Sequence, residues 1–186
     1  MIFYPYVTIY PAVQRRLRSF EHRGVYVDWC DLSTVEAPSE EAYYWALAER
    51  WRRCAQAQED LVIIEQDVLP SWKQYQSFLT CPLRYCGYHT WLGASYGAGL
   101  GANRFRWEVL DAYDIPTVIH DYADGSIPPR AWQRLDTRIN DALATRGVAL
   151  DCHGVMAHLH PYPIPDPLIR HIYVARYSSS RRSPLP

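Results

Sequence analysis

Residues 61–67 read Leu61-Val62-Ile63-Ile64-Glu65-Gln66-Asp67: four apolar residues are followed at once by two acids that flank a glutamine. An apolar run without alternation is typical of a strand that is buried on both faces, as in a parallel sheet. Open α/β sheets bind their ligands at the carboxyl edge of such strands. The stretch therefore predicts an α/β fold with a candidate site at Glu65 and Asp67.

The segments before this strand alternate between strand and helix patterns. Residues 2–10 are rich in β-branched and aromatic side chains, which predicts a first strand. Residues 12–23 read as a helix that Gly24 ends in the left-handed conformation, and residues 25–29 read as the next strand. A longer helix is expected from Ser39, and its apolar stripe predicts that it covers the sheet.

The segments after the strand are less regular. Ser71 is expected to cap a short helix that ends at residue 79. Residues 81–103, which hold five glycines, are expected to be irregular, and a helix is expected over residues 104–113. Residues 115–121 read as a short strand, and residues 128–147 as a helix that starts at a proline and ends at Gly147.

Length and composition indicate one folded domain. The chain has 186 residues, of which 48% are hydrophobic and 21% charged, close to the average for globular domains. We expect a single α/β domain over residues 1–177, with a mostly parallel central sheet and flanking helices. A flexible tail rich in arginine, serine and proline is expected over residues 178–186.

Charge and cysteine content exclude several classes of protein. The formal net charge of −1 argues against binding nucleic acid or membrane by bulk charge. The five cysteines form neither paired C-x-x-C spacings nor an even set, so they predict neither a disulfide framework nor a zinc ribbon. The chain shows no signal peptide and no apolar stretch of membrane-spanning length, which predicts a cytoplasmic protein.

Glu65 and Asp67 are suited to hold a hard divalent cation. Carboxylate oxygens suit Mg²⁺ or Mn²⁺, and such an ion can bridge a diphosphate. The alternative is two solvated acids in a loop. Their position directly after a buried strand favours the metal, because acids clustered at that edge repel one another unless something neutralises them.

The late histidines offer a second set of ligands. His158 and His160 share a face if their segment is extended, whereas His153 points the other way or lies in the preceding turn. They could complete a metal site or bind phosphate, although a single histidine is often a structural hydrogen-bonding residue. A zinc site made of Cys152, His153, His158 and His160 is a further alternative, but its spacing matches no structural zinc pattern.

Four stretches together resemble the GT-A class of nucleotide-sugar-dependent glycosyltransferases, in particular its small phage and bacterial members. They are residues 61–67, 100–105, 132–136 and 158–160. In that family an acidic motif, usually D-x-D, binds a divalent metal, commonly Mn²⁺, that holds the donor diphosphate, and a late histidine often completes the coordination. By resemblance Asp67 is the foremost metal ligand, Glu65 assists, and His158 or His160 contributes. This chain departs from D-x-D in having glutamate first.

The resemblance implies metal-dependent transfer of a sugar from a nucleotide-diphosphate donor, foremost a UDP-sugar, to an acceptor hydroxyl. The metal would stabilise the negative charge that develops on the leaving diphosphate. Tyr4 or Tyr26 is placed to stack on the base, and Asp28, expected with Asp31 in the loop after its strand, is placed to meet the base or the ribose.

An inverting reaction would also need a base for the acceptor hydroxyl. The candidates are Asp121 and Asp124, expected in a loop, and Glu108, near the start of a helix. If a phage encodes the chain, a hydroxymethylated base in DNA is an acceptor that the arginines of residues 176–182 could engage. Protein, lipid and glycan hydroxyls remain open. The rival functions are a noncatalytic α/β binding or structural module and a zinc hydrolase that uses the late histidines.

Overall fold

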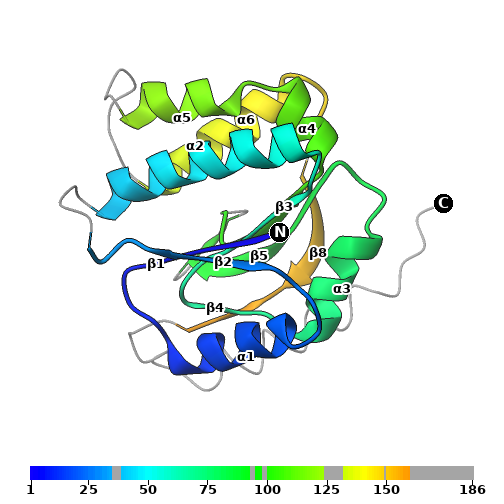
Figure 1. Cartoon of the computed structure of the whole chain (residues 1–186). Helices are drawn as coiled ribbons and strands as arrows, with labels where there is room; N and C mark the ends of the chain where they lie inside the picture. Colours follow the sequence, from blue (N-terminus) through cyan, green and yellow to red (C-terminus); the bar gives the residue numbers. More distant parts are fainter. Residues whose placement is uncertain (35–38, 93–94, 98–99, 124–131, 149, 160–186) are drawn as a thin grey trace.

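A mixed β-sheet lies between two layers of helices in the computed structural model (Figure 1). The structure describes residues 1–34, 39–92, 95–97, 100–123, 132–148 and 150–159. Helices α2 (Ser39–Ala57), α4 (Trp107–Ala112), α5 (Ile115–Ala123) and α6 (Trp132–Ala144) cover one face of the sheet, and α1 (Pro11–Glu21) and α3 (Trp72–Thr80) cover the other.

Within the described residues the sheet has seven strands, in the order β2-β1-β3-β7-β5-β6, with β8 paired to β5. Strand β1 is parallel to both β2 and β3, and β5 is parallel to β8. Strand β7 runs antiparallel to its neighbours β3 and β5. The sheet is therefore mostly parallel, as the sequence predicts. The strands are β1 (Ile2–Tyr6), β2 (Val27–Asp31), β3 (Leu61–Ile64), β5 (Tyr85–Leu92), β6 (Ser95–Gly97), β7 (Ala102–Phe105) and β8 (Asp151–Val155).

Strand β3 is buried on both faces, which explains its uninterrupted apolar run. Leu61 and Ile63 belong to the core under α2 (Ser39–Ala57), α4 (Trp107–Ala112), α5 (Ile115–Ala123) and α6 (Trp132–Ala144). Val62 and Ile64 belong to the core under α1 (Pro11–Glu21) and α3 (Trp72–Thr80). Successive side chains of a strand point to opposite faces, so each face receives two of the four.

Local capping signals place several helix ends where the sequence predicts them. Ser71 and Gln74 form a reciprocal capping box at the start of α3. Gly24 follows α1 with a φ of +82°, and Gly147 follows α6 with a φ of +74°. Both glycines adopt the left-handed conformation that ends a helix.

The prediction of an irregular segment over residues 81–103 is wrong. This segment holds β5 and β6 and the start of β7, and Arg104 lies in β7, so the following helix begins only at Trp107. Gly87 shows the physical reason. A Cβ there would lie 1.9 Å from the side-chain oxygen of Asn103 on the paired strand, so this glycine permits close approach within a sheet and does not mark a loop.

Two further predictions near the helices are corrected. Residues 115–121 form α5 and not a strand: Ile115 and Ile119 lie one turn apart and are buried, and the carboxylate of Asp114 accepts hydrogen bonds from Thr117 in the manner of an N-cap. Asp28 and Asp31 lie in β2 and not in a loop, because β2 pairs with β1 along its whole length. The expected tail over residues 178–186 is outside the described residues.

Candidate functional site

The turn after β3 lies at the carboxyl edge of three parallel strands, next to the ends of β1 and β2. The turn is closed by a 3.1 Å hydrogen bond from the N–H of Val68 to the carbonyl of Glu65. The N–H of Glu65 donates to the carbonyl of Gly101 at 2.9 Å. The backbone that carries Glu65 and Asp67 is therefore held from both sides.

Gln66, the middle residue of the acidic stretch, binds this turn to β1. Its side-chain oxygen accepts hydrogen bonds from the N–H groups of Val7 at 2.8 Å and Thr8 at 3.1 Å. Its backbone carbonyl accepts one from the hydroxyl of Tyr4 at 3.1 Å. Gln66 thus positions the two acids on either side of it, a role that sequence reasoning missed.

The last described segment of the chain lies beside this turn. Strand β4 (Val68–Leu69) pairs antiparallel with β9 (Ala157–His158), with Val68 opposite His158. The N–H of Leu159 donates a 2.6 Å hydrogen bond to the carbonyl of Asp67. The backbone of His158 therefore lies next to the acidic turn. The placement of the His158 side chain and of His160 is outside what the structure describes.

Asp31 is a third carboxylate at this edge, which sequence reasoning did not select. It ends β2 and is exposed, and its Oδ1 accepts hydrogen bonds from the N–H of Ser33 at 2.9 Å and the hydroxyl of Ser33 at 2.6 Å. These bonds lower the pKa of Asp31, so it is ionised at neutral pH. A serine two residues after an aspartate at a strand end is the sequence signal for this geometry.

Tyr4 does not reach the surface. It is fully buried and packs edge-to-face on Trp29, with ring centroids 5.1 Å apart. Burial and the nearby charge of Asp67 raise the pKa of the Tyr4 hydroxyl, so it stays protonated and donates to Gln66. The prediction that Tyr4 stacks on a base is wrong, because neighbouring side chains cover its ring.

Tyr26 and Asp28 are not brought together with the acidic turn. Tyr26 is 56% exposed but directly precedes β2, so it lies at the amino edge of the parallel strands, opposite the turn. Asp28 forms a 2.8 Å ion pair with Arg50 of α2. Their predicted contacts with a donor bound at Asp67 are therefore not supported by this placement.

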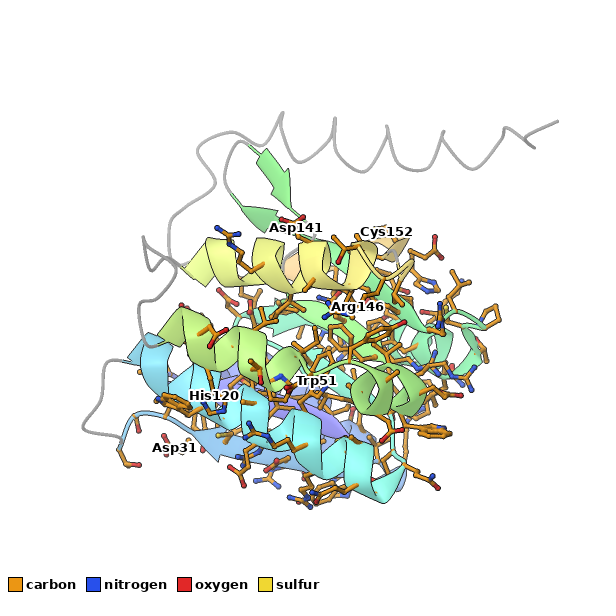
Figure 2. The ribbon with its side chains drawn as sticks, turned by 90° about the horizontal axis from the view of Figure 1, so that it is seen from above. Asp31, Trp51, His120, Asp141, Arg146 and Cys152 are labelled. Atoms are coloured by element: carbon orange, nitrogen blue, oxygen red, sulfur yellow. The ribbon has the colours of Figure 1, made fainter. Side chains whose placement is uncertain are left out.

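The three candidate bases are placed differently. Glu108 lies in the first turn of α4, just after β7, and β7 ends opposite Leu61 at the start of β3. Because that end is the amino edge, Glu108 is remote from Asp67. Asp121 lies in α5 next to His120, whose ring contacts Trp45 in the first half of α2 at 4.3 Å. Figure 2 shows His120 on the same side of the molecule as Asp31, and Asp124 is outside the described residues.

The predicted zinc site had four ligands, Cys152, His153, His158 and His160. The structure does not bring the first two of them to one point. Cys152 and His153 are neighbours in β8 and point to opposite faces. The sulfur of Cys152 donates to the carbonyl of Gly154 at 3.3 Å. His153 instead lies near Cys81 and Cys86.

Comparison with known proteins supports the fold. No protein-family model matches the sequence, and no curated protein matches it. Among solved structures, the chain is similar to the crystal structure of a glycosyltransferase involved in the glycosylation of the major capsid of PBCV-1. The TM-score is 0.55 at 13% identity, over 96% of this chain and 89% of that chain. The chain thus has a single-domain α/β fold of a kind that a glycosyltransferase uses. None of the helices in the described residues combines the length and hydropathy that a membrane span requires.

Proposed function

We propose that this chain is a glycosyltransferase that moves a sugar from a nucleotide-diphosphate donor to an acceptor hydroxyl, with the donor at the carboxyl edge of β1, β2 and β3. One observation carries the proposal: the acidic turn and the backbone of His158 lie side by side at this edge, in a fold that a glycosyltransferase shares. Ligands bind at this edge in open α/β sheets.

The cation of this proposal is a hard divalent one, Mn²⁺ or Mg²⁺. Asp31, Glu65 and Asp67 lie at this edge and carry carboxylate oxygens, which these ions prefer. They do not form a group whose ligand atoms all lie within 4.8 Å of one another, so a bound cation would have to draw the carboxylates together. A bound ion would supply positive charge against the developing charge of the leaving diphosphate. The chain's own part is to hold the carboxylates in place, through the hydrogen bonds of Gln66 with Tyr4 of β1 and with the two residues that follow β1.

The finer parts of the proposal concern the substrates and the base. UDP-sugars are the donors to test first. Asp121, which follows His120 in α5, is the candidate base for an inverting reaction, with Asp124 next. The structural neighbour takes part in the glycosylation of a capsid protein, so hydroxyls of a viral protein are acceptors to test beside a hydroxymethylated base in phage DNA.

Isothermal titration calorimetry with UDP, with and without Mn²⁺, tests the proposal. We expect binding that requires the metal and that Asp67→Asn abolishes, with an unchanged far-UV circular dichroism spectrum. Asp141→Asn is the matched control, because Asp141 is exposed on α6 and away from Asp31 in Figure 2. Nucleotide binding that does not require the metal, or that persists in Asp67→Asn, would contradict the proposed site. The absence of any nucleotide binding would favour the noncatalytic module.

A further inference from the structure

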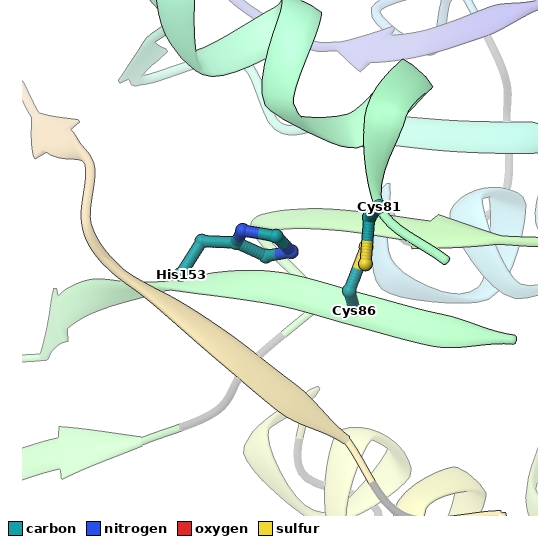
Figure 3. A group of neighbouring side chains, drawn as sticks. All are labelled: Cys81, Cys86 and His153. Carbon is teal, nitrogen blue, oxygen red and sulfur yellow. The ribbon is translucent and has the colours of Figure 1, made fainter. Parts of the chain in front are cut away.

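A second group of metal-ligating side chains lies on the α1 and α3 side of the sheet. Cys81 directly follows α3, Cys86 lies in β5, and His153 lies in β8 (Figure 3). One ligand atom from each, the two sulfurs and an imidazole nitrogen, lie within 4.8 Å of one another. Two cysteines five residues apart and a histidine from a distant strand thus come together as three potential ligands.

The two cysteines of this group are buried, and aromatic rings pack against the imidazole. Cys81 is 6% exposed and Cys86 is fully buried. The His153 ring packs near the rings of Phe78 and Tyr88, with centroids 6.3 Å and 5.6 Å away. Figure 3 shows the imidazole directed toward the two sulfurs.

The Nε2 atom of His153 lacks a partner in this environment. It is buried, and among the described residues it makes no hydrogen bond. A buried polar atom without a partner costs about 1–3 kcal/mol in proteins. A cation between Nε2 and the sulfurs would remove that cost.

We propose that Cys81, Cys86 and His153 bind one Zn²⁺ ion that joins α3, β5 and β8. Thiolate and imidazole are the ligands that zinc prefers, and three protein ligands leave a fourth position for water. Ligand atoms on a tetrahedral zinc lie about 3.3–3.8 Å apart, given bonds of roughly 2.0–2.3 Å. The three ligand atoms lie within 4.8 Å of one another, so the side chains must move closer together to close the site around an ion.

Charge favours a divalent ion over a monovalent one. Two thiolates and a neutral imidazole around Zn²⁺ have no net charge, which suits a buried site. The buried Arg104, which is close enough to Cys86 to lower its pKa, is already paired with Asp60 at 2.6 Å, and it donates to the carbonyl of Cys81 at 2.9 Å. A monovalent ion would leave one negative charge buried and uncompensated.

Binding is expected to release protons. Burial and the adjacent Cys81 sulfur raise the pKa of the Cys86 thiol, whereas Arg104 acts in the opposite direction. Zinc must displace the protons, so its affinity should rise with pH.

Cobalt titration of the reduced full-length chain, freed of metal with a chelator, tests this site. We expect thiolate-to-cobalt charge-transfer absorption that saturates at one equivalent and disappears when Zn²⁺ is added. Cys86→Ala and His153→Gln should each weaken cobalt binding by more than about 100-fold, beyond the loss that removal of an outer-shell partner causes. Cys54→Ala is the matched control, because Cys54 is equally buried but lies in α2 on the other face of the sheet.

Two results would overturn the proposal: a folded, reduced wild-type chain that gives no charge-transfer absorption, or equal absorption in all three variants. Circular dichroism shows whether each variant is folded, and His153→Gln, at a half-buried position, is the variant that best preserves the core. The zinc site is separate from the proposed donor site. Asp67→Asn should leave the cobalt spectrum unchanged, so either proposal can fail without the other.

Discussion

The N–H of Leu159 donates a 2.6 Å hydrogen bond to the carbonyl oxygen of Asp67, and this bond joins the end of the described chain to the turn after the central strand. The short pairing of β4 with β9 extends the contact. Because the bond is made by backbone atoms, it fixes where β9 lies whatever side chains the two residues carry.

Leu159→Pro removes this hydrogen bond, since proline has no N–H. If binding of the donor depends on the position of β9, the affinity for UDP in the presence of the metal should fall roughly 5- to 10-fold, the equivalent of about 1 kcal/mol. Calorimetry measures the change. Leu159→Ala loses the same side chain but keeps the N–H, so it should bind close to wild type, and equal affinities for the two variants would show that the bond is not needed.

The sequence predicts those elements whose signals are local. Strand β3 is recognisable because both of its faces are buried, and α3 because Ser71 and Gln74 carry a capping box. The strands β5 and β7 are missed because pairing with a distant strand decides them. Gly87 reads as a loop residue until Asn103 is seen to occupy the space above it.

The residues of the candidate site also differ in whether local sequence is enough to predict their position. Glu65 and Asp67 could be placed at the sheet edge, because only the end of β3 has to be known. Tyr4 could not be assigned, since its exposure depends on Trp29 of the neighbouring strand. The group of Cys81, Cys86 and His153 could not be predicted from the sequence either, because it depends on the parallel register of β5 with β8.

Gly87→Ala should destabilise the sheet by about 1–3 kcal/mol, the usual cost of overpacking. The added Cβ would lie 1.9 Å from the Asn103 side-chain oxygen and 3.1 Å from the carbonyl of Ala102. Urea denaturation measures the free energy of unfolding. In a double-mutant cycle with Asn103→Ala, the two losses should sum to more than the loss in the double variant, because the shorter side chain removes the main clash. Additive losses would show that the two residues do not compete for this space.

Asp60→Ala should cost about 3 kcal/mol, the lower end for breaking a buried ion pair, because the Asp60 side chain is 31% exposed. Asp60 accepts two hydrogen bonds from the buried Arg104 and a third from the N–H of Trp107 at the start of α4. Its loss leaves the guanidinium charge uncompensated. Glu49→Ala is the comparison, since it breaks an ion pair at a glutamate that is 70% exposed and should cost less than about 1 kcal/mol in the same urea measurement.

Asp114→Ala should destabilise the chain by about 1 kcal/mol at pH 7, because it removes the cap of α5. The hydroxyl and the N–H of Thr117 donate to the Asp114 carboxylate at 2.6 Å and 3.2 Å, and these bonds lower the pKa of Asp114 in the folded chain. The ionised cap therefore contributes fully above the unfolded pKa of about 4, and its contribution is lost as the pH falls through the lower folded pKa.

The difference in unfolding free energy between wild type and Asp114→Ala should accordingly shrink below about pH 4. Asp114→Asn separates the charge from the cap, because asparagine caps a helix about as well as aspartate but does not titrate. Its stability at pH 7 should stay near that of wild type, and this site should add nothing to its acid sensitivity. A loss for Asp114→Ala that is the same at pH 3 and pH 7 would show that the charge of Asp114 plays no part in capping α5.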